Sequence, residues 1–185
     1  MELFLVEAYD LKRLLNIYQL YRKAFPSNER KPFVLMLKKR RKKIFEILSI
    51  EDRNGTFVGL AIVIKYRDLA LLDYFAVAPG KRSSGIGSEA FQILKSRYSK
   101  YRFFLEIENT YIETPDIAER KKRKNFYLKN GMSEIPFIVE LFGVEMELMG
   151  NGCKLTFEEY HSIFTGIFGK IISNNVRLIK ENWTL

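Results

Sequence analysis

The stretch of this sequence best suited to chemistry is a loop rich in glycine and serine that separates two periodic segments. Residues 78–91 read APGKRSSGIGSEAF and follow LALLDYFAV, a run that predicts a buried strand. Small residues let the backbone approach an anion closely, and amides at the start of a helix can donate to phosphate oxygens. The pattern Arg82-x-x-Gly85-x-Gly87 therefore indicates a phosphate-binding loop, although a plain surface turn would use the same glycines.

This loop fits neither of two common nucleotide-binding fingerprints. A Walker loop requires Gly-Lys-Ser/Thr after four intervening residues, and no such sequence is present. A dinucleotide-binding fold requires a third glycine, for which Ala90 is only a loose match, and an acidic residue at the end of a second parallel strand. About one chain in twenty of this length would show the pattern by chance. The neighbouring segments must therefore decide between a phosphate-binding loop and a surface turn.

Composition limits the chemistry that is available. The chain has 185 residues, 47% of them hydrophobic, which is enough for one domain with a real core. It has one cysteine, Cys153, which excludes an internal disulfide and a cysteine metal cluster. It has one histidine, His161, which makes a zinc site or a Ser-His-Asp triad unfavourable. Acid–base work must then fall to Tyr, Asp, Glu or water. We expect no metal.

The sequence gives no sign of a membrane protein. It contains no run of the roughly 20 apolar residues that span a bilayer. Its first residues, MELFLVEAYD, lack the basic and apolar regions of a signal peptide. We therefore expect a cytoplasmic protein with no membrane partner.

The net charge of +9 suggests an anionic partner. Two basic runs contribute most to it, KKRRKK at 38–43 and RKKRK at 120–124. Neither run is interleaved with the aromatic residues that usually accompany nucleic-acid binding. We favour a solvated helix face for the first run and, in the second, for Arg123 and Lys124, and we do not expect a nucleic-acid partner.

The periodic segments predict a mixed α/β domain in the order β-α-α-β-β-β-α-β-α-β-β-α. An Asn54-Gly55 pair predicts a hairpin, Asn130-Gly131 a helix stop, and Thr156 with Glu159 a capping box. Strands are expected over 3–8, 44–51, 56–66, 69–77, 101–108, 134–142 and 144–149. Helices are expected from Asp10 to Phe25, from Pro32 through 43, after the glycine loop, over 116–129, and from Thr156 to about Lys180. The domain would span 1–185, with its core ending at about 150 and a helical extension over 151–185.

Three segments together resemble a known family. LLDYFAVAPGKRSSGIGSEAF, at 71–91, strongly resembles motif A of the GNAT superfamily of N-acetyltransferases. FFLEIEN at 103–109 resembles the family's next strand, and RKNFYLKNGM at 123–132 resembles its next helix. The resemblance implies the GNAT fold, a mixed central sheet of about seven strands flanked by helices, here with an extra C-terminal helix.

The resemblance also implies acetyl-CoA as co-substrate. The glycine loop would bind the pyrophosphate of coenzyme A, and the backbone at the end of the preceding strand would pair with the pantetheine arm. Lys81 would add positive charge beside the diphosphate, and Arg123 could meet the nucleotide end, with a solvated helix face as its alternative. The implied loop residues are Arg82, Ser83, Ser84, Gly85, Ile86, Gly87 and Ser88, and the implied strand residues are Phe75, Ala76 and Val77.

For catalysis, the resemblance places Tyr127 where many family members hold the tyrosine that protonates the leaving thiolate, although it could simply pack beside Phe126. Asp73 is our first candidate for the base, because a polar residue rarely interrupts LLxYFAV without a partner. Glu106, Glu108 or a water molecule could serve instead. Three further carboxylates are candidates for binding the acceptor amine: Glu106 and Glu108, which share a strand face, and Glu29, in a loop that often shapes the acceptor site of the family.

These features predict an N-acetyltransferase that moves an acetyl group from acetyl-CoA to a primary amine of a small molecule or peptide, by direct attack in a ternary complex. The alternative is a non-catalytic module of the same fold that binds coenzyme A or nucleic acid. The sequence leaves the acceptor open, and it leaves open a homodimer formed through the amphipathic C-terminal helix.

Overall fold

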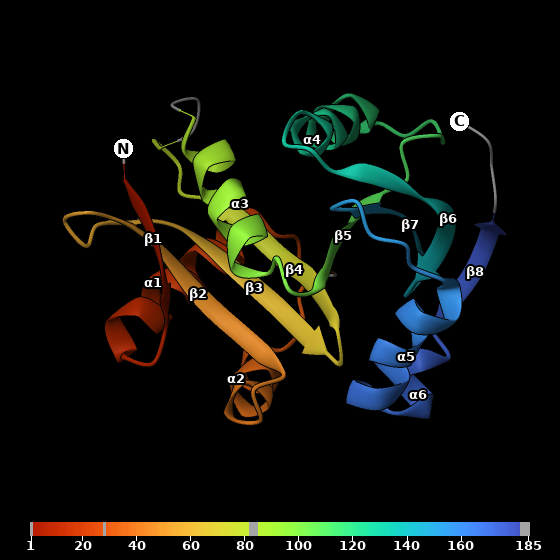
Figure 1. The fold of residues 1–185 in the computed structure, drawn as a ribbon, viewed down its shortest axis with the longest axis horizontal. Helices are drawn as coiled ribbons and strands as arrows, with labels where there is room; N and C mark the ends of the chain where they lie inside the picture. Colours follow the sequence, from red (N-terminus) through yellow and green to blue (C-terminus); the bar gives the residue numbers. More distant parts are fainter. Residues whose placement is uncertain (1, 28, 82–84, 182–185) are drawn as a thin grey trace. The chain divides into compact units, whose positions relative to one another are not determined.

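A computed structural model describes residues 2–27, 29–81 and 85–181 (Figure 1). The chain divides into two compact units, Met1–Lys100 and Tyr101–Leu185. The first unit contains β1 (Leu3–Glu7), α1 (Leu11–Ala24), α2 (Phe33–Arg41), β2 (Phe45–Asp52), β3 (Phe57–Tyr66), β4 (Leu69–Val77) and α3 (Ile86–Arg97). The second contains β5 (Arg102–Glu108), α4 (Ile117–Lys129), β6 (Ser133–Leu141), β7 (Val144–Gly150), α5 (Phe157–Phe168), α6 (Lys170–Ser173) and β8 (Val176–Glu181).

In the first unit, β1, β2, β3 and β4 pair antiparallel in that order. The ring of Tyr74 on β4 meets Tyr21 of α1 edge-on, with 4.8 Å between ring centroids. The next residue, Phe75, packs against Phe91 of α3 at 5.9 Å. Because successive strand residues point to opposite faces, α1 and α3 cover opposite faces of these strands.

The pairing of β3 with β4 is irregular at one point and unusually close at another. Ile62 pairs with Tyr74 but Val63 pairs with Leu72, so Asp73 is the extra residue of a β-bulge. Farther along, a Cβ atom placed on Gly59 would lie 2.6 Å from the carbonyl oxygen of Ala76. Only glycine allows β3 to come this close to the end of β4.

In the second unit, the strands pair antiparallel in the order β5-β7-β6-β8. The helix α5 supplies much of this unit's core through Tyr160 and Phe164, whose rings lie 5.2 Å apart. Tyr160 also meets Phe104 of β5 and Phe137 of β6, and all four aromatic side chains are buried. The C-terminal segment is therefore part of the packed unit.

The prediction of one C-terminal helix to about Lys180 is wrong beyond Phe168. The helix α5 begins with the predicted capping box of Thr156 and Glu159. Gly169 then takes φ +85° and ψ 169°, an extended left-handed conformation that ends the helix, and the chain continues into the short α6 and the strand β8. Pairing with the edge of β6 satisfies the backbone of β8, which explains why a strand replaces the helix here.

The other predicted elements are confirmed within one to three residues at their ends. With β8 added, the described residues form eight strands, where about seven were predicted. The mixed α/β class is confirmed. The single-domain organisation stays a prediction.

Candidate functional site

The glycine loop leads from β4 directly into α3. Lys81 donates its backbone N–H to the carbonyl of Ala78 at 3.1 Å, which closes a turn just after the strand. Gly85 precedes α3 with φ +77°, a left-handed conformation that favours glycine, and it offers no side chain to cap the helix. The first amides of a helix have no partner within it, so Ile86 and Gly87 stand where an anion would be bound. Arg82, Ser83 and Ser84 lie outside the described residues, and the exposed Ser88 is in the first turn of α3.

The strand segment from Phe75 to Val77 has its side chains turned into the protein. Phe75 and Val77 pack against an apolar cluster that includes Ile86 and Ala90 of α3. The residue between them, Ala76, is 9% exposed. A ligand at this strand would therefore meet its backbone, which fits the predicted pairing with a pantetheine arm.

The predicted base, Asp73, is buried and ion-paired. Its side chain is 2% exposed, and its Oδ1 atom lies 2.6 Å from the Nζ atom of Lys31 in the loop between α1 and α2. Its other oxygen, Oδ2, is buried and has no hydrogen-bond partner among the described residues. Since a buried polar atom without a partner is costly, Oδ2 is available to a donor group on a ligand.

Glu29 lies in the same loop but contributes its backbone. Tyr74 donates its hydroxyl to the carbonyl oxygen of Glu29 at 2.8 Å, and Lys31 donates its N–H to the Tyr74 oxygen at 3.0 Å. The Glu29 residue itself is exposed. Tyr74, the residue after Asp73, thus holds this loop against β4.

Tyr127 is a buried phenol on α4. Burial raises the pKa of Tyr127 to about 12, the nearby charge of Glu108 adds to the rise, and the charge of Arg123 opposes it. Arg123 and Glu108 form an ion pair from α4 to β5. The structure therefore brings three of the predicted site residues together in the second unit, and Arg123 has a carboxylate partner there.

Glu106 has a partner that the sequence did not indicate. Tyr160 of α5, fully buried, donates its hydroxyl to the Oε1 atom of Glu106 at 2.6 Å. The amphipathic pattern of the C-terminal helix is consistent with a buried ring at Tyr160. Only the ring is explained by that pattern, and nothing in the spacing signalled the hydroxyl's contact with β5.

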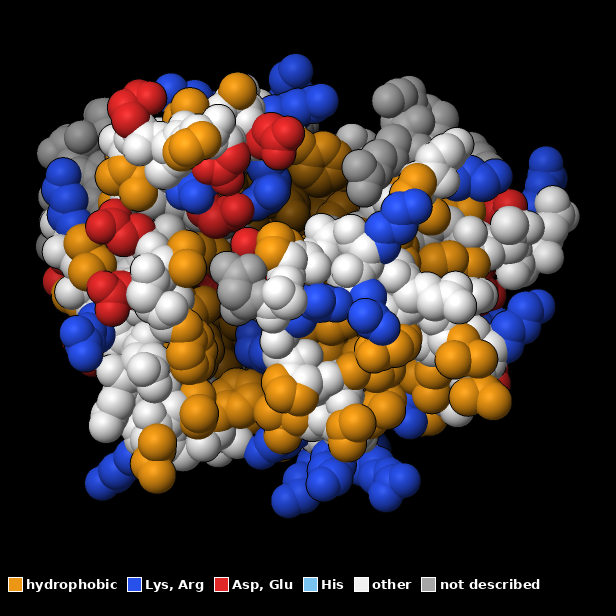
Figure 2. Space-filling view, turned by 180° about the vertical axis from the view of Figure 1, so that it is seen from behind, with side chains coloured by type: hydrophobic (Ala, Val, Ile, Leu, Met, Phe, Trp, Pro, Cys, Tyr) orange, Lys and Arg blue, Asp and Glu red, His pale blue; other side chains and the backbone are white. Residues whose placement is uncertain are grey.

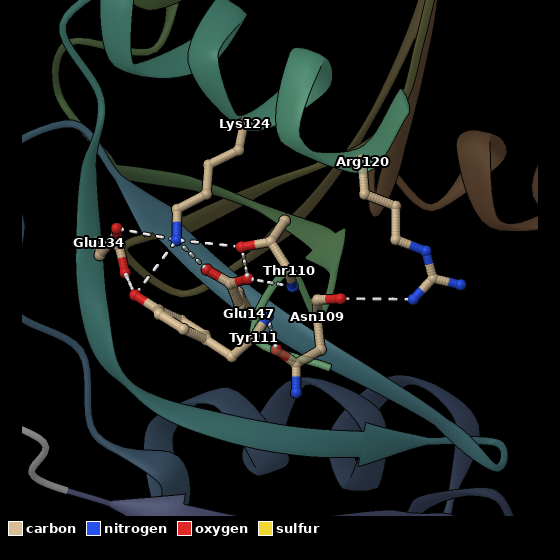
Figure 3. Close-up of polar contacts among 7 residues, drawn as sticks. All are labelled: Asn109, Thr110, Tyr111, Arg120, Lys124, Glu134 and Glu147. Carbon is tan, nitrogen blue, oxygen red and sulfur yellow. Dashed lines mark hydrogen bonds and ion pairs between the residues drawn. The ribbon is translucent and has the colours of Figure 1, made fainter. Parts of the chain in front are cut away.

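A second group of polar residues, also missed by the sequence analysis, surrounds Lys124 (Figure 3). The Nζ atom of Lys124 lies 2.6 Å from Glu147 of β7 and 2.9 Å from Glu134 of β6. It also lies 4.3 Å from the ring centroid of Tyr111. Glu147 in turn accepts hydrogen bonds from the backbone and the hydroxyl of Thr110 at 2.5 and 2.6 Å.

This arrangement corrects the interpretation of Lys124 as part of a solvated face, whereas Lys121, Lys122 and Arg123 are exposed. Lys124 is only 8% exposed. Burial acts to lower its pKa, but hydrogen bonds with Glu147, Glu134 and Tyr111 outweigh burial and raise it. The cluster ties α4 to β6, β7 and the loop after β5, and α4 is the helix that presents Tyr127.

The other basic run agrees better with the prediction of a solvated face. Four of its residues, Lys38, Arg41, Lys42 and Lys43, are exposed near the end of α2. Lysine and arginine side chains gather at the lower end of the view in Figure 2, where α2 lies. Arg40 differs, because it donates to the carbonyl of Ala8 and lies over the ring of Tyr9.

Two further observations concern metals and membranes. Among the described residues, no three His, Cys, Asp or Glu side chains are grouped to hold a metal ion. In the same part of the chain, every helix is too short or too polar to cross a bilayer.

No protein-family model and no curated protein matches this chain, but solved structures do. A structure from Bacteroides thetaiotaomicron named for the GNAT acetyltransferase family aligns with a TM-score of 0.71 and 20% identity, over 92% of this chain and 99% of its own. Spermidine N-acetyltransferase from Vibrio cholerae, in complex with CoA and spermine, aligns with a TM-score of 0.63 and 16% identity, over 80% and 94%. A dodecameric structure of the Vibrio enzyme aligns with a TM-score of 0.62 and 16% identity, over 80% and 92%.

At these identities the likeness establishes the fold. The chain has the fold of GNAT-family acetyltransferases, as the resemblance of residues 71–91 and 123–132 predicted.

Proposed function

We propose that this chain is an N-acetyltransferase that moves the acetyl group of acetyl-CoA to a primary amine. The observation that supports this most is the glycine loop, which opens α3 at Gly85 directly after β4 within a GNAT fold. In such a fold, backbone amides at a helix start provide the natural place for a diphosphate. The complex of the Vibrio enzyme with CoA and spermine makes polyamines the first acceptors to test.

On this proposal, the residues of the loop bind the pyrophosphate and the backbone of β4 pairs with the pantetheine arm. The side chains of Phe75 and Val77 are partly buried against the apolar cluster, and the backbone of this strand suits an arm that carries amide groups. Lys81 supplies positive charge beside the loop. Arg123 is the weaker candidate for the nucleotide end, because Glu108 already neutralises its charge.

The transfer needs a neutral amine and a protonated leaving group. Asp73, or a water molecule, takes the proton from the acceptor nitrogen. Tyr127 gives a proton to the departing thiolate, and its raised pKa of about 12 keeps the phenol protonated at neutral pH. Glu106, Glu108 and Glu29 are the carboxylates proposed to attract a cationic acceptor.

Two measurements test the proposal. Acetyl-CoA and free CoA are expected to raise the melting temperature, while duplex DNA is not. A panel of polyamines, aminoglycosides, amino acids and peptide N-termini, followed by thiol release, then identifies the acceptor.

The competing function is a non-catalytic module that binds coenzyme A or nucleic acid, and the exposed basic residues of α2 are the observation in its favour. Stabilisation by DNA alone would support the nucleic-acid module and overturn our proposal. Stabilisation by CoA without thiol release from any amine would support a binding module.

A further inference from the structure

We infer that Lys31 is itself an acetylation site, and that the protein transfers an acetyl group to this lysine from bound acetyl-CoA. The inference rests on the proposed function, because it uses the same donor and the same base. It differs in naming a residue of the chain as the acceptor.

The side-chain amine of Lys31 lies next to Asp73, the proposed base. The Nζ atom of Lys31 lies 2.6 Å from Oδ1 of Asp73, a distance at which a proton can pass between them. The Asp73 side chain is 2% exposed and that of Lys31 is 21% exposed, so the pair is largely shielded from water. If Asp73 accepts the proton of an acceptor amine, the amine that occupies this position in the structure is the one of Lys31.

The backbone beside Lys31 is held at three points. Tyr21 donates its hydroxyl to the carbonyl oxygen of Lys31 at 2.9 Å, and the Tyr74 oxygen accepts the Lys31 N–H at 3.0 Å. Tyr74 also donates to Glu29. Its ring centroid lies 5.4 Å from the Lys31 ammonium. Such fixation of an amine next to a base is the arrangement that makes an intramolecular reaction efficient.

The position along β4 also suits the donor. Asp73 is the extra residue of the bulge and precedes Phe75, where the segment proposed to pair with the pantetheine arm begins, by only two residues. Lys31, in the loop between α1 and α2, therefore lies beside the strand that the thioester is proposed to follow.

The reaction balances as an ordinary acyl transfer. Lys31 Nζ loses one proton to Asp73, its lone pair forms a C–N bond with the acetyl carbon, and the C–S bond of the thioester breaks. As the amide forms, the Lys31 nitrogen loses its second proton, the leaving thiolate of coenzyme A takes up one proton, and Asp73 passes the first proton to water. The product is an amide at Lys31 with no charge, which frees Asp73 for an external amine.

Lys65 is a matched control within the same unit. Its ammonium is paired with Glu46, and its side chain is 22% exposed, almost as much as that of Lys31. Lys65 differs in lying on β3 and away from Asp73, so non-enzymatic acetylation would treat the two lysines alike.

The test is to incubate the full chain with acetyl-CoA alone and to map acetyl-lysine by peptide mass spectrometry over time. We expect Lys31 to be acetylated at least tenfold faster than Lys65, at a rate independent of protein concentration. The variant D73N should abolish this preference. Equal rates at Lys31 and Lys65 in the wild-type protein would overturn the inference.

Two lysine-to-arginine variants guard against misfolding. K31R keeps the positive charge beside Asp73 but cannot form the product, so no acetyl group should appear in its peptide. K65R should leave the acetylation of Lys31 unchanged. If an external amine is acetylated while Lys31 stays unmodified, the inference fails and the proposed function stands. If acetyl-CoA neither stabilises the protein nor releases thiol, the proposed function fails as well.

Discussion

At the scale of single residues, the proposed chemistry depends most on the hydroxyl of Tyr127. We expect Tyr127→Phe to lower kcat by about 10²-fold, because it removes only the proton offered to the leaving thiolate. KM for acetyl-CoA should change little, since the ring is kept and still packs against Phe126. Thiol release under saturating acetyl-CoA measures the effect. A variant that kept full turnover would remove the proton-donor role and leave the donor site untouched.

At the scale of elements, the close approach of β3 to β4 shapes the strand segment proposed to bind the pantetheine arm. We expect Gly59→Ala to raise KM for acetyl-CoA at least severalfold, because a Cβ atom there would push on the carbonyl of Ala76. The control is Gly143→Ala in the turn between β6 and β7. Its φ is +83°, and a Cβ atom added there would have no atom within 4 Å apart from its chain neighbours. It should cost about 1 kcal/mol of stability without a change in KM. Equal KM values in the wild type and Gly59→Ala would contradict the assignment of this strand to the donor.

The cluster around Lys124 gives a second prediction at this scale. Lys124→Met leaves the buried Glu147 and the partly buried Glu134 without their cation, and we expect a loss of about 3 kcal/mol in the free energy of unfolding. Arg120→Gln is the control on the same helix. It breaks a pair with Asp116, whose side chain is 47% exposed, and should cost no more than about 1 kcal/mol. Urea unfolding measures both variants, and equal losses would mean that the buried cluster adds nothing beyond a surface pair.

The elements that could be predicted from the sequence are those whose structure is determined by neighbouring residues. Local signals located the hairpin at Asn54-Gly55, the capping box at Thr156 and the glycine loop, because each depends on neighbouring residues. The strand β8 exists through its pairing with β6, a partner some forty residues away, so local periodicity favoured a helix there.

The contacts within the candidate site were harder to predict than the elements. The pairing of Lys31 with Asp73 joins residues 42 positions apart, and that of Tyr160 with Glu106 joins residues 54 positions apart. Neither pair has a spacing signature. The resemblance to a family supplied candidate residues, and only the fold supplied their partners.

At the scale of the whole molecule, the net charge of +9 should act on an anionic donor. We expect KM for acetyl-CoA to rise as salt is added, because the Debye length shrinks to about 10 Å at 0.1 M and screens the attraction. Steady-state kinetics in increasing NaCl measures the effect. The double variant Lys42→Gln/Lys43→Gln removes charge from the exposed end of α2 and should leave KM nearly unchanged at fixed salt. A KM independent of salt would mean that the excess positive charge serves something other than the donor.

Buried tyrosines couple the stability of the whole molecule to alkaline pH. Burial is the largest cause that raises the pKa of Tyr21 and of Tyr98, and a hydrogen bond to Glu46 raises that of Tyr98 further. Tyr127 is raised to about 12. Since an unfolded tyrosine ionises at about 10, the stability from these groups is complete below that pH and is lost as pH rises through their folded values.

We therefore expect the melting temperature to fall steadily above pH of about 10, and tyrosinate absorbance from the buried rings to appear only together with loss of the circular-dichroism signal. Tyr98→Phe removes one of these ionisations and should make the fall shallower, with Tyr9→Phe, an exposed residue, as the control. If all 10 tyrosines titrate while the fold persists, the buried phenols are reachable by water and the coupling fails. The same result would remove the argument that Tyr127 stays protonated through the range in which the acceptor amine becomes neutral.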